Sequence, residues 1–452
     1  MHKVGAGNTV ARSQYSHVAP KRDRKGLFAR TEAISFMRRS NPGIKALDNA
    51  AGRLAFGLCR AWGAVRRLWS ARQRQSDVRA PESVRSILVI KLCCLGDAIL
   101  TIPAIRALKE CFPNARISVL TTPRSCDAYV GLPFIDDVTV ANLTGLGGLG
   151  ELLRRGLADG VRSLRAVRRM RPDIAVDLDL YFKATPVLAF LSGAPIRVGF
   201  DTEGCQRAGL FTHSAPRHRT QHELLCFLDV VGAIGVQTDD RSLMFPVSAE
   251  DVAGASRALV AAGVPEDAKL VALCPGSSKN WPEKQWPVAG FAKVGDWLAE
   301  RLGARVVLIG AGSDRDVVAQ TLSLMTHEGV SIAGITTVRE TGAVLRRCEL
   351  FVTNDTGPLH LAAALDVPTV AVFGPTDDRK WRPWHGRSRV VRVEACDRAP
   401  CYWLSSMPDC PDVRCLAELA PEAVIAAAES LLEEISGKAP NQGEGVPRAD
   451  GE

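Results

Sequence analysis

The chain has 452 residues, of which 46% are hydrophobic and 23% are charged, and this length and composition predict two globular domains. The net charge of +8 arises in residues 1–80, which hold 17 Lys or Arg against 4 Asp or Glu, while the rest of the chain sums to −5. Because the body of the chain is mildly acidic, its charge does not indicate a nucleic-acid-binding protein.

The sequence has no recognisable targeting segment. No apolar segment follows the first basic residues, as in a secretory signal, and no run reaches about 18 uninterrupted apolar residues, as in a transmembrane helix. Most of the 13 Cys stand alone, which favours a reducing compartment over a disulfide scaffold. We therefore expect a cytoplasmic protein.

Residues 1–80 form a basic extension in two parts. Residues 1–43 are polar and basic and are expected to be disordered. Apolar residues then recur at spacings of three and four from Ile44 to Trp69 with arginines opposite, so residues 44–75 are predicted to form an amphipathic helix. Such a helix suits the inner face of the cytoplasmic membrane as a partner. Docking on the body of the same protein is the alternative.

From Glu82 onward, short apolar runs alternate with helical patterns, which predicts doubly wound parallel sheets. The first group of predicted strands is 86–91, 116–120, 174–178 and 197–200. The pattern restarts after about residue 250 with 270–274, 305–309, 350–353 and 369–373. We therefore predict an α/β protein with Rossmann-like domains at 81–245 and 246–436 and a disordered tail at 437–452.

The first motif runs from Lys91 to Pro103 and contains Gly96 and Asp97. A strand ends, a Gly permits a tight turn, and Asp97 falls where the next helix starts. Loops at the carboxyl edge of such a sheet face the ligand crevice, so this carboxylate can reach a substrate. The alternative is an N-cap that accepts hydrogen bonds from backbone amides.

The second motif follows the predicted strand at 270–274. Ser277 and Ser278 come directly after a Gly, and Lys279 and Lys284 follow ahead of a predicted helix. Hydroxyls, amides and ammonium groups that converge at a strand end make a phosphate-binding site. The alternative is an ordinary polar loop with solvated lysines.

The third motif joins two predicted strands through Asp355, Thr356, Gly357 and His360 and an Ala-rich helix. The amides of Thr356 and Gly357 lie at the start of that helix, where its dipole is positive, and this arrangement suits a diphosphate. In the alternative, Asp355 is a cap and His360 a core residue. That explanation covers each residue singly but not their joint occurrence between two adjacent strand ends.

Together the three motifs resemble glycosyltransferase family 9, the ADP-heptose:lipopolysaccharide heptosyltransferases. The matches are Lys91, Gly96, Asp97 and Pro103, then Pro275, Gly276, Lys284, Trp286, Pro287 and Phe291, then Asp355, Thr356, Gly357, His360 and Phe373 to Asp377. The resemblance implies the GT-B fold, in which two Rossmann-like domains face each other across a cleft. It also implies that the N-terminal domain binds the acceptor and the C-terminal domain the sugar nucleotide.

The resemblance further implies an inverting displacement that moves heptose from ADP-heptose to a lipopolysaccharide core or a related glycolipid. Asp97 would be the catalytic base, and Asp355 would hold sugar hydroxyls. The donor-binding residues it implies are Ser277, Ser278, Lys284, Asp355, Thr356, Gly357 and His360. No metal or other cofactor is expected beside the sugar nucleotide.

Two assignments of residues have alternatives. A second Lys-x-Trp-Pro makes Lys279 an alternative phosphate ligand, although the spacing to Phe291 favours Lys284. Zinc binding is a minor alternative for four cysteines near the C-terminus, whose spacings are not those of a standard site; they are Cys396, Cys401, Cys410 and Cys415.

The function also has alternatives. One is a transferase of the same chemistry for another sugar or acceptor, such as an O-antigen or capsule enzyme. Another is a non-catalytic sugar-nucleotide-binding protein, which the presence of Asp97 beside a phosphate motif argues against. A third is an epimerase of the same fold that acts on UDP-sugars.

Overall fold

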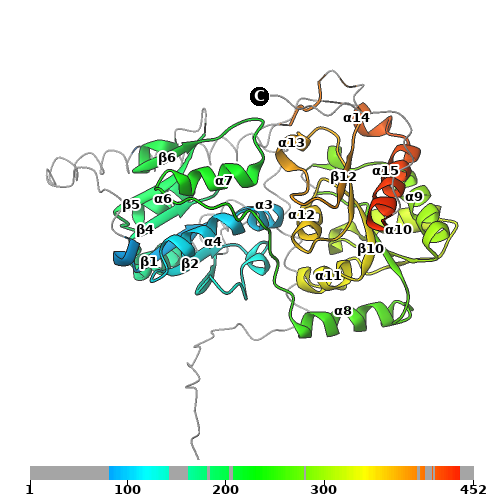
Figure 1. Ribbon diagram of the computed structural model, residues 1–452, viewed down its shortest axis with the longest axis horizontal. Coiled ribbons are helices and arrows are strands. Elements are labelled where there is room, and N and C mark those ends of the chain that lie inside the picture. Colours follow the sequence, from blue (N-terminus) through cyan, green and yellow to red (C-terminus); the bar gives the residue numbers. More distant parts are fainter. Residues whose placement is uncertain are drawn as a thin grey trace, which may run out of the picture.

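The computed structural model describes residues 57, 81–141, 161–180, 184–202, 207–278, 281–393, 396, 398–402, 410 and 413–437. These residues form two six-stranded parallel sheets that lie side by side with helices around them (Figure 1). The helix predicted at 44–75 and the tail predicted at 437–452 lie outside the described residues, apart from Gly57 and Gly437.

The first sheet has the strand order β3-β2-β1-β4-β5-β6, with all neighbours parallel. Its order reverses at β1, so the loop after β1 opens onto the crevice where such sheets bind ligands. The strands are β1 (Ser86–Ile90), β2 (Arg116–Thr121), β3 (Asp137–Val140), β4 (Ile174–Asp177), β5 (Ile196–Asp201) and β6 (His213–Pro216).

The second sheet repeats this arrangement with the order β12-β11-β10-β7-β8-β9, again all parallel. Because β7 pairs with β10, the loops after these two strands lie next to each other at the carboxyl edge. The strands are β7 (Leu270–Cys274), β8 (Arg305–Leu308), β9 (Gly329–Ser331), β10 (Cys348–Asn354), β11 (Thr369–Val372) and β12 (Ser388–Val391).

The two sheets confirm the predicted fold class. Every predicted strand is present, and its ends differ from the prediction by no more than two residues. The sequence does not predict the four strands at the sheet edges, which are β3, β6, β9 and β12. The domain boundaries at 81, 246 and 437 stay predictions.

Helices cover both faces of each sheet. We call β1–β6 with α3, α4, α6 and α7 the N-terminal unit, and β7–β12 with α8 to α15 the C-terminal unit. The helices are α3 (Leu95–Leu100), α4 (Ile102–Cys111), α6 (Ala184–Leu191), α7 (Glu223–Gly232), α8 (Ala249–Ala261), α9 (Val288–Leu302), α10 (Arg315–Leu324), α11 (Val338–Leu345), α12 (Gly357–Ala364), α13 (Asp378–Trp381), α14 (Arg414–Ala417) and α15 (Pro421–Ile435).

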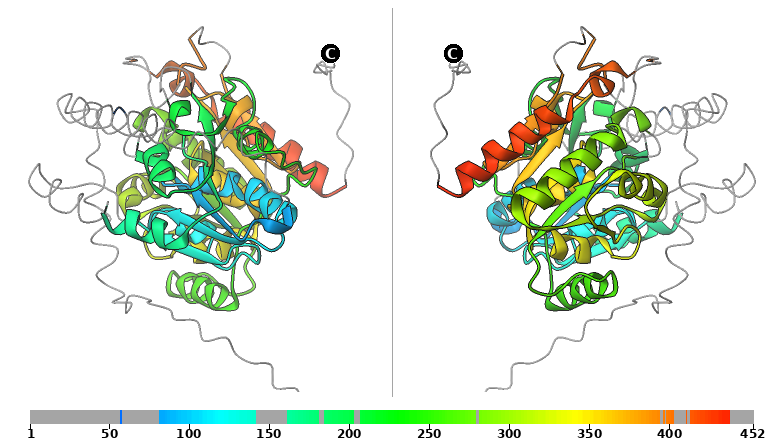
Figure 2. Two further views of the ribbon diagram at one scale, coloured as in Figure 1. Left: turned by 90° about the vertical axis from the view of Figure 1, so that its left-hand side faces the viewer. Right: turned by 90° about the vertical axis from the view of Figure 1, so that its right-hand side faces the viewer.

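The alternation of side chains along each central strand divides the core between these faces. Ile87 of β1 packs with residues of α4 and α7, whereas its neighbour Leu88 packs with residues of α6. In the same way Ala272 of β7 packs with α11 and α12, and Leu273 packs with α9 and α15. Figure 2 shows α15 along the outside of the C-terminal unit.

Local sequence signals set several helix ends. Ser248 and Asp251 form a capping box at the start of α8, and Thr337 and Glu340 form another at the start of α11. Each box satisfies backbone amides that have no partner within the helix. Helix α9 ends at Leu302 and is capped by Gly303, whose φ of 59° is a left-handed conformation that glycine adopts without strain.

The two units are joined by a buried cluster of charges as well as by apolar packing. Glu223 at the start of α7 is fully buried and accepts hydrogen bonds from Arg217 Nε at 3.0 Å and Nη2 at 3.1 Å. Lys380 of α13, in the other unit, places its Nζ 2.7 Å from Glu223 Oε2 and donates to the carbonyl of His218 at 2.8 Å. This cluster fixes α13 against α7.

Candidate active site

The three sequence motifs all follow central strands. Asp97 lies after β1, Ser277 and Ser278 lie after β7, and Asp355 follows β10 directly. Helix α3, which carries Asp97, packs against α12, which carries His360, and Figure 1 shows these two helices facing each other between the units. The fold thus brings the motifs of both units to one region.

Asp97 is part of a helix but does not cap it. Helix α3 begins at Leu95, its N-cap is Cys94, and Asp97 lies in the first turn. Asp97 is 8% exposed, and its carboxylate Oδ2 lies 3.7 Å from Lys91 Nζ. Because the cap position belongs to Cys94, the interpretation of Asp97 as an N-cap is wrong.

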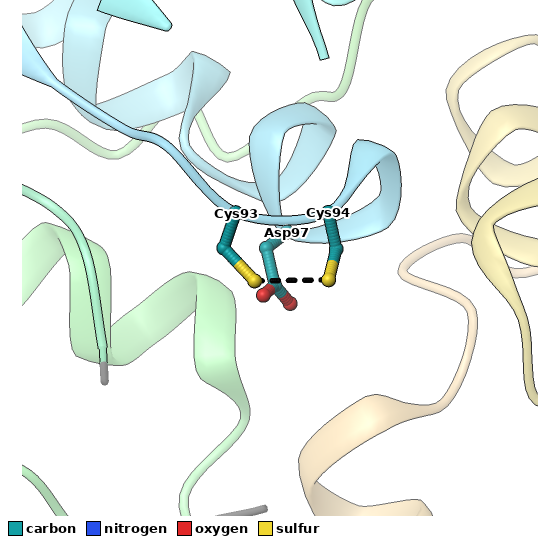
Figure 3. A group of neighbouring side chains, drawn as sticks. All are labelled: Cys93, Cys94 and Asp97. Atoms are coloured by element: carbon teal, nitrogen blue, oxygen red, sulfur yellow. Dashed lines mark hydrogen bonds between the residues drawn. The ribbon is translucent and has the colours of Figure 1, made fainter. Parts of the chain in front are cut away.

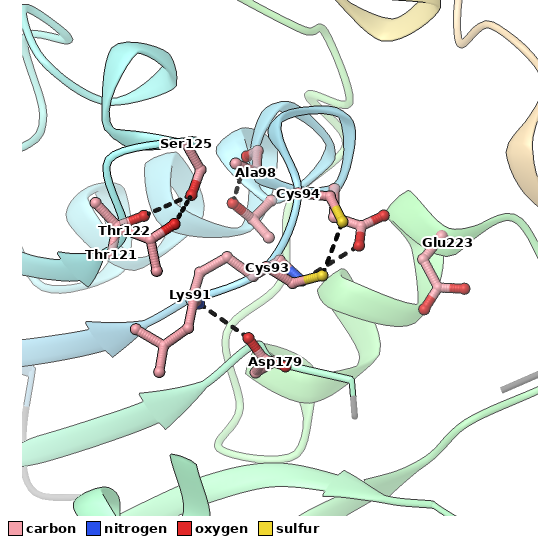
Figure 4. A network of polar contacts seen from close by, with 12 residues as sticks. Lys91, Cys93, Cys94, Ala98, Thr121, Thr122, Ser125, Asp179 and Glu223 are labelled. Carbon is pink, nitrogen blue, oxygen red and sulfur yellow. Dashed lines mark hydrogen bonds and ion pairs between the residues drawn. The ribbon is translucent and has the colours of Figure 1, made fainter. Parts of the chain in front are cut away.

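Lys91 is a fully buried cation at the end of β1. Its Nζ has no hydrogen-bond partner among the described residues and lies 5.2 Å from the centre of the Phe227 ring. Burial alone would lower the pKa of Lys91, but the carboxylates of Asp97 and Asp179 raise it above its usual value, so the side chain stays charged. Figure 4 shows Lys91 and Asp179 beside the loop that precedes Asp97.

The environment of Asp97 makes its carboxylate a stronger base than an ordinary aspartate. Burial raises the pKa of Asp97 above its usual value, and Lys91 offsets only part of this effect. Glu223 adds a further increase through charge repulsion. A carboxylate with a raised pKa accepts a proton more readily, which is the property a general base requires.

Gly96 explains how the two units come so close at this point. A Cβ atom at position 96 would lie 2.5 Å from Cδ2 of His360, so only glycine leaves room for the imidazole. At Gly357 the packing is less tight, because a Cβ atom there would lie 3.7 Å from Cβ of Leu95, an ordinary contact. His360 is 4% exposed, and burial lowers its pKa to about 4, so the ring is neutral near pH 7.

The second motif contributes to a pocket of 340 Å³. Ser277 and Ser278 line it together with Ser313 and Asp314, which follow β8. A Cβ atom at position 276 would lie 2.7 Å from the Asp314 carboxyl carbon, so Gly276 allows the two loops to approach. The pocket offers hydroxyls and the carboxylates of Asp314 and Asp316 at the edge of the sheet.

Lys284 and Asp355 are partners in the structure. The Lys284 Nζ donates to Asp355 Oδ2 at 2.9 Å, and it also lies 4.6 Å from the centre of the Tyr402 ring. Burial alone would raise the pKa of Asp355, but the Lys284 ammonium outweighs it and holds the pKa below its usual value. The pair brings the second and third motifs into direct contact. Lys279 lies outside the described residues.

Asn354 is a residue that the sequence analysis missed. Its buried amide donates to the carbonyls of Pro275 and Gly276 at 3.0 and 3.1 Å, and its Oδ1 accepts from the Trp286 amide at 3.0 Å. Trp286 itself is buried and donates from its indole to the Leu419 carbonyl at 3.1 Å. Asn354 therefore fastens both ends of the connection between β7 and α9, which carries the serines and Lys284. The sequence signal that could have identified Asn354 is its position between the predicted strand at 350–353 and Asp355.

The four C-terminal cysteines share one location. Cys396, Cys401, Cys410 and Cys415 line the same small cavity, together with Glu283 and Pro375. Within the described residues, however, no three of these thiols lie close enough together to form a ready metal site. The structure therefore brings the cysteines to one place without forming the zinc site that was an alternative in the sequence.

A comparison with protein-family models identifies the family. The model of glycosyltransferase family 9 (heptosyltransferase) matches residues 161–406, which is more than half of the chain. The chain belongs to glycosyltransferase family 9. This membership confirms the predicted enzyme class, a glycosyltransferase.

Individual proteins resemble this family 9 member over most of its length. Lipopolysaccharide heptosyltransferase 2 of Salmonella typhimurium is 28% identical over 368 residues, which cover 77% of this chain and 99% of that protein. The solved structure of a family 9 glycosyltransferase from Veillonella parvula superposes with a TM-score of 0.64 at 25% identity and covers 79% of this chain and 100% of its own.

The E. coli ADP-heptose LPS heptosyltransferase II structure has a TM-score of 0.61 at 20% identity and covers 78% of this chain and 99% of its own. These superpositions confirm the GT-B fold of the family 9 chain. Among the described residues, no helix is both long and apolar enough to cross a bilayer.

Proposed function

We propose that this glycosyltransferase moves heptose from ADP-heptose to a lipopolysaccharide core or a related glycolipid, with inversion at the anomeric carbon. The C-terminal unit would bind the sugar nucleotide and the N-terminal unit the acceptor. The observation that carries this proposal is the contact of Gly96 with His360, because it brings the Asp97 helix against the helix that opens with Thr356 and Gly357. The related heptosyltransferases support the choice of sugar.

In this mechanism Asp97 removes the proton of an acceptor hydroxyl. The acceptor oxygen forms a bond to the anomeric carbon while the bond from that carbon to the diphosphate oxygen breaks. The proton moves to the Asp97 carboxylate, and the bonding electrons leave with the nucleoside diphosphate. Lys91, 3.7 Å from Asp97, keeps the carboxylate paired in a buried position before the acceptor binds.

Charge that develops on the diphosphate needs donors fixed in advance. We assign this role to the hydroxyls of Ser277 and Ser278, the ammonium of Lys284, and the amides of Thr356 and Gly357 at the positive end of α12. A lysine ammonium has three N–H donors, so Lys284 can hold Asp355 with one and a phosphate with another. Asp355 keeps an oxygen for sugar hydroxyls, and the neutral His360 packs beside the donor.

The decisive experiment is a transfer assay with purified protein, several nucleotide sugars and a deep-core lipopolysaccharide acceptor. We expect ADP-heptose to support transfer and GDP- and UDP-sugars to give little product. We also expect the rate to persist in EDTA, because Lys284 and the helix terminus supply the positive charge. Product linkage, read by NMR, should show the inverted anomer.

Each other outcome of this assay points to an alternative. Transfer from a different sugar nucleotide would show that the donor is not ADP-heptose, while the proposed inverting displacement would still apply. Conversion of a UDP-sugar without acceptor would indicate an epimerase. Loss of the rate in EDTA, with recovery on adding a divalent ion, would contradict metal-free catalysis.

Lys284→Ala is expected to weaken the binding of ADP by about 10- to 100-fold, the cost of losing a charge-assisted contact. The variant also leaves the buried Asp355 carboxylate without its partner at 2.9 Å, so a melting curve must accompany the calorimetric titration. Lys279→Ala serves as the matched control. If Lys279→Ala weakens binding more, the phosphate role belongs to Lys279.

We also propose that the protein is cytoplasmic and that residues 44–75 attach it to the inner face of the cytoplasmic membrane. Each basic residue near an anionic surface contributes about 1 kcal/mol, and a glycolipid acceptor would make attachment useful. Full-length protein should sediment with anionic vesicles, and a chain starting at Pro81 should not. If both forms stay in solution and the shorter one melts much lower, the helix docks on the protein itself.

A further inference from the structure

Two thiols and a carboxylate meet at the start of α3. Cys93 and Cys94 are consecutive, and their Sγ atoms lie 2.9 Å apart. These two sulfurs and a carboxylate oxygen of Asp97 all lie within 4.8 Å of one another, and the described part of the chain holds no second group of this kind. Figure 3 shows the three side chains pointing to the same side of the loop.

We propose that Cys93, Cys94 and Asp97 bind a thiophilic divalent cation such as Zn²⁺, and that this cation inhibits the enzyme. Two thiolates and one carboxylate are ligands that zinc accepts in tetrahedral sites, where the fourth position can hold water. On binding, each thiol loses its proton to solvent and each sulfur donates an electron pair to the metal. No electron transfer is involved.

The geometry needs only a small adjustment. With Zn–S bonds of about 2.3 Å, two sulfurs on one zinc lie about 3.8 Å apart, so the thiols must separate by about 1 Å. Rotation of the Cys94 side chain can supply this, because Cys94 is exposed and Cys93 is half-buried. The same exposure gives an ion a path to the site.

The charges around the site include both signs. Asp179 and Glu223 act on Asp97 as negative neighbours, while Lys91 and Arg217 act as positive ones. Figure 4 shows Asp179 and Glu223 in the neighbourhood of Cys93. Lys91 lies 3.7 Å from Asp97 Oδ2, so the other carboxylate oxygen is the one available to a cation.

Zinc binding leads to inhibition if Asp97 is the catalytic base. The inhibition, unlike the binding, therefore rests on the proposed function. A cation that takes the lone pair of the Asp97 carboxylate prevents it from accepting a proton from the acceptor. General-base catalysis contributes about 10²- to 10⁴-fold, so zinc at saturation should slow transfer by about 100-fold or more. Removal of the metal by EDTA should restore the rate.

The test uses the full chain and two variants that each remove two thiols. Zinc binding is measured by competition with a chromophoric chelator, and transfer is measured with and without Zn²⁺, each rate relative to the same variant without zinc. Cys93→Ser/Cys94→Ser should bind one equivalent less than the full chain and should lose zinc inhibition. Cys111→Ser/Cys126→Ser is the matched control, and it should bind as much zinc as the full chain and remain inhibited by zinc. Any zinc bound by the C-terminal cysteines would remain in the Cys93/Cys94 variant, so the loss of one equivalent of bound zinc reports on the proposed site alone.

Cys94→Ser alone changes only the exposed thiol and serves if the double variant does not fold; it should weaken zinc binding at this site. Equal zinc binding by the full chain and the Cys93/Cys94 variants would overturn the site. Zinc bound through these cysteines with an undiminished transfer rate would overturn the inhibition, and it would count against Asp97 as the base. Failure of heptose transfer with zinc binding intact would instead overturn the proposed donor.

Discussion

Asp97→Asn is expected to lower kcat by about 10²- to 10⁴-fold, the usual contribution of a general base. Asparagine keeps the size of the side chain but cannot accept the proton of the acceptor hydroxyl. Donor binding should change little, because the motifs assigned to the donor lie on the C-terminal unit. Steady-state kinetics with saturating donor and acceptor, together with calorimetric titration of ADP, would separate the two effects.

The control for this prediction must address the buried cation that loses its counter-charge. Lys91 is fully buried and lies 3.7 Å from Asp97, so the variant's melting temperature has to be recorded beside its activity. Asp137→Asn removes a carboxylate from an exposed pair with Arg116 and should leave kcat unchanged. A folded Asp97→Asn enzyme with near-normal turnover would remove Asp97 from the mechanism.

Glu223→Gln should destabilise the protein by about 3–5 kcal/mol, because it leaves Arg217 and Lys380 buried without their counter-charge. Burial alone would raise the pKa of Glu223, but these two cations lower it below its usual value, so the carboxylate is ionised in the native protein. Chemical denaturation of the variant and the parent chain measures the difference in the free energy of unfolding.

Two further variants make this measurement specific. Glu223→Gln/Lys380→Met removes one stranded cation and should recover part of the lost stability. Asp137→Asn breaks an exposed ion pair and should cost no more than about 1 kcal/mol. A loss for Glu223→Gln as small as that of Asp137→Asn would mean that the cluster between α7 and α13 does not hold the units together.

The sequence predicts the central strands well and the edge strands not at all, for a physical reason. Central strands of a parallel sheet are buried on both faces and appear as continuous apolar runs, as in Leu270–Cys274. Edge strands such as Asp137–Val140 and Gly329–Ser331 are only partly buried and carry polar residues or glycine. Each edge strand has a neighbour on one side only, so it lacks the continuous apolar run that marks a buried strand.

In the candidate site, too, the sequence predicts features that depend on nearby residues but not contacts between distant ones. Motifs at strand ends identify Asp97 and Asp355, because their spacing from the strands is local. The sequence does not predict that Lys284 and Asp355 pair, that Asn354 fastens the connection between β7 and α9, or that His360 packs against Gly96. Each of these contacts joins residues that are distant in the chain, and only the packing of one element on another brings them together.

The close packing of His360 on Gly96 limits how hybrid enzymes could be made from two members of this fold. Two Rossmann-like units in tandem could be expected to be exchangeable between relatives. Here the two units meet through a glycine on one side and an imidazole on the other, and through Glu223 and Lys380 in the buried cluster. A hybrid that replaced only the C-terminal unit would therefore have to keep a histidine opposite Gly96 and a lysine opposite Glu223.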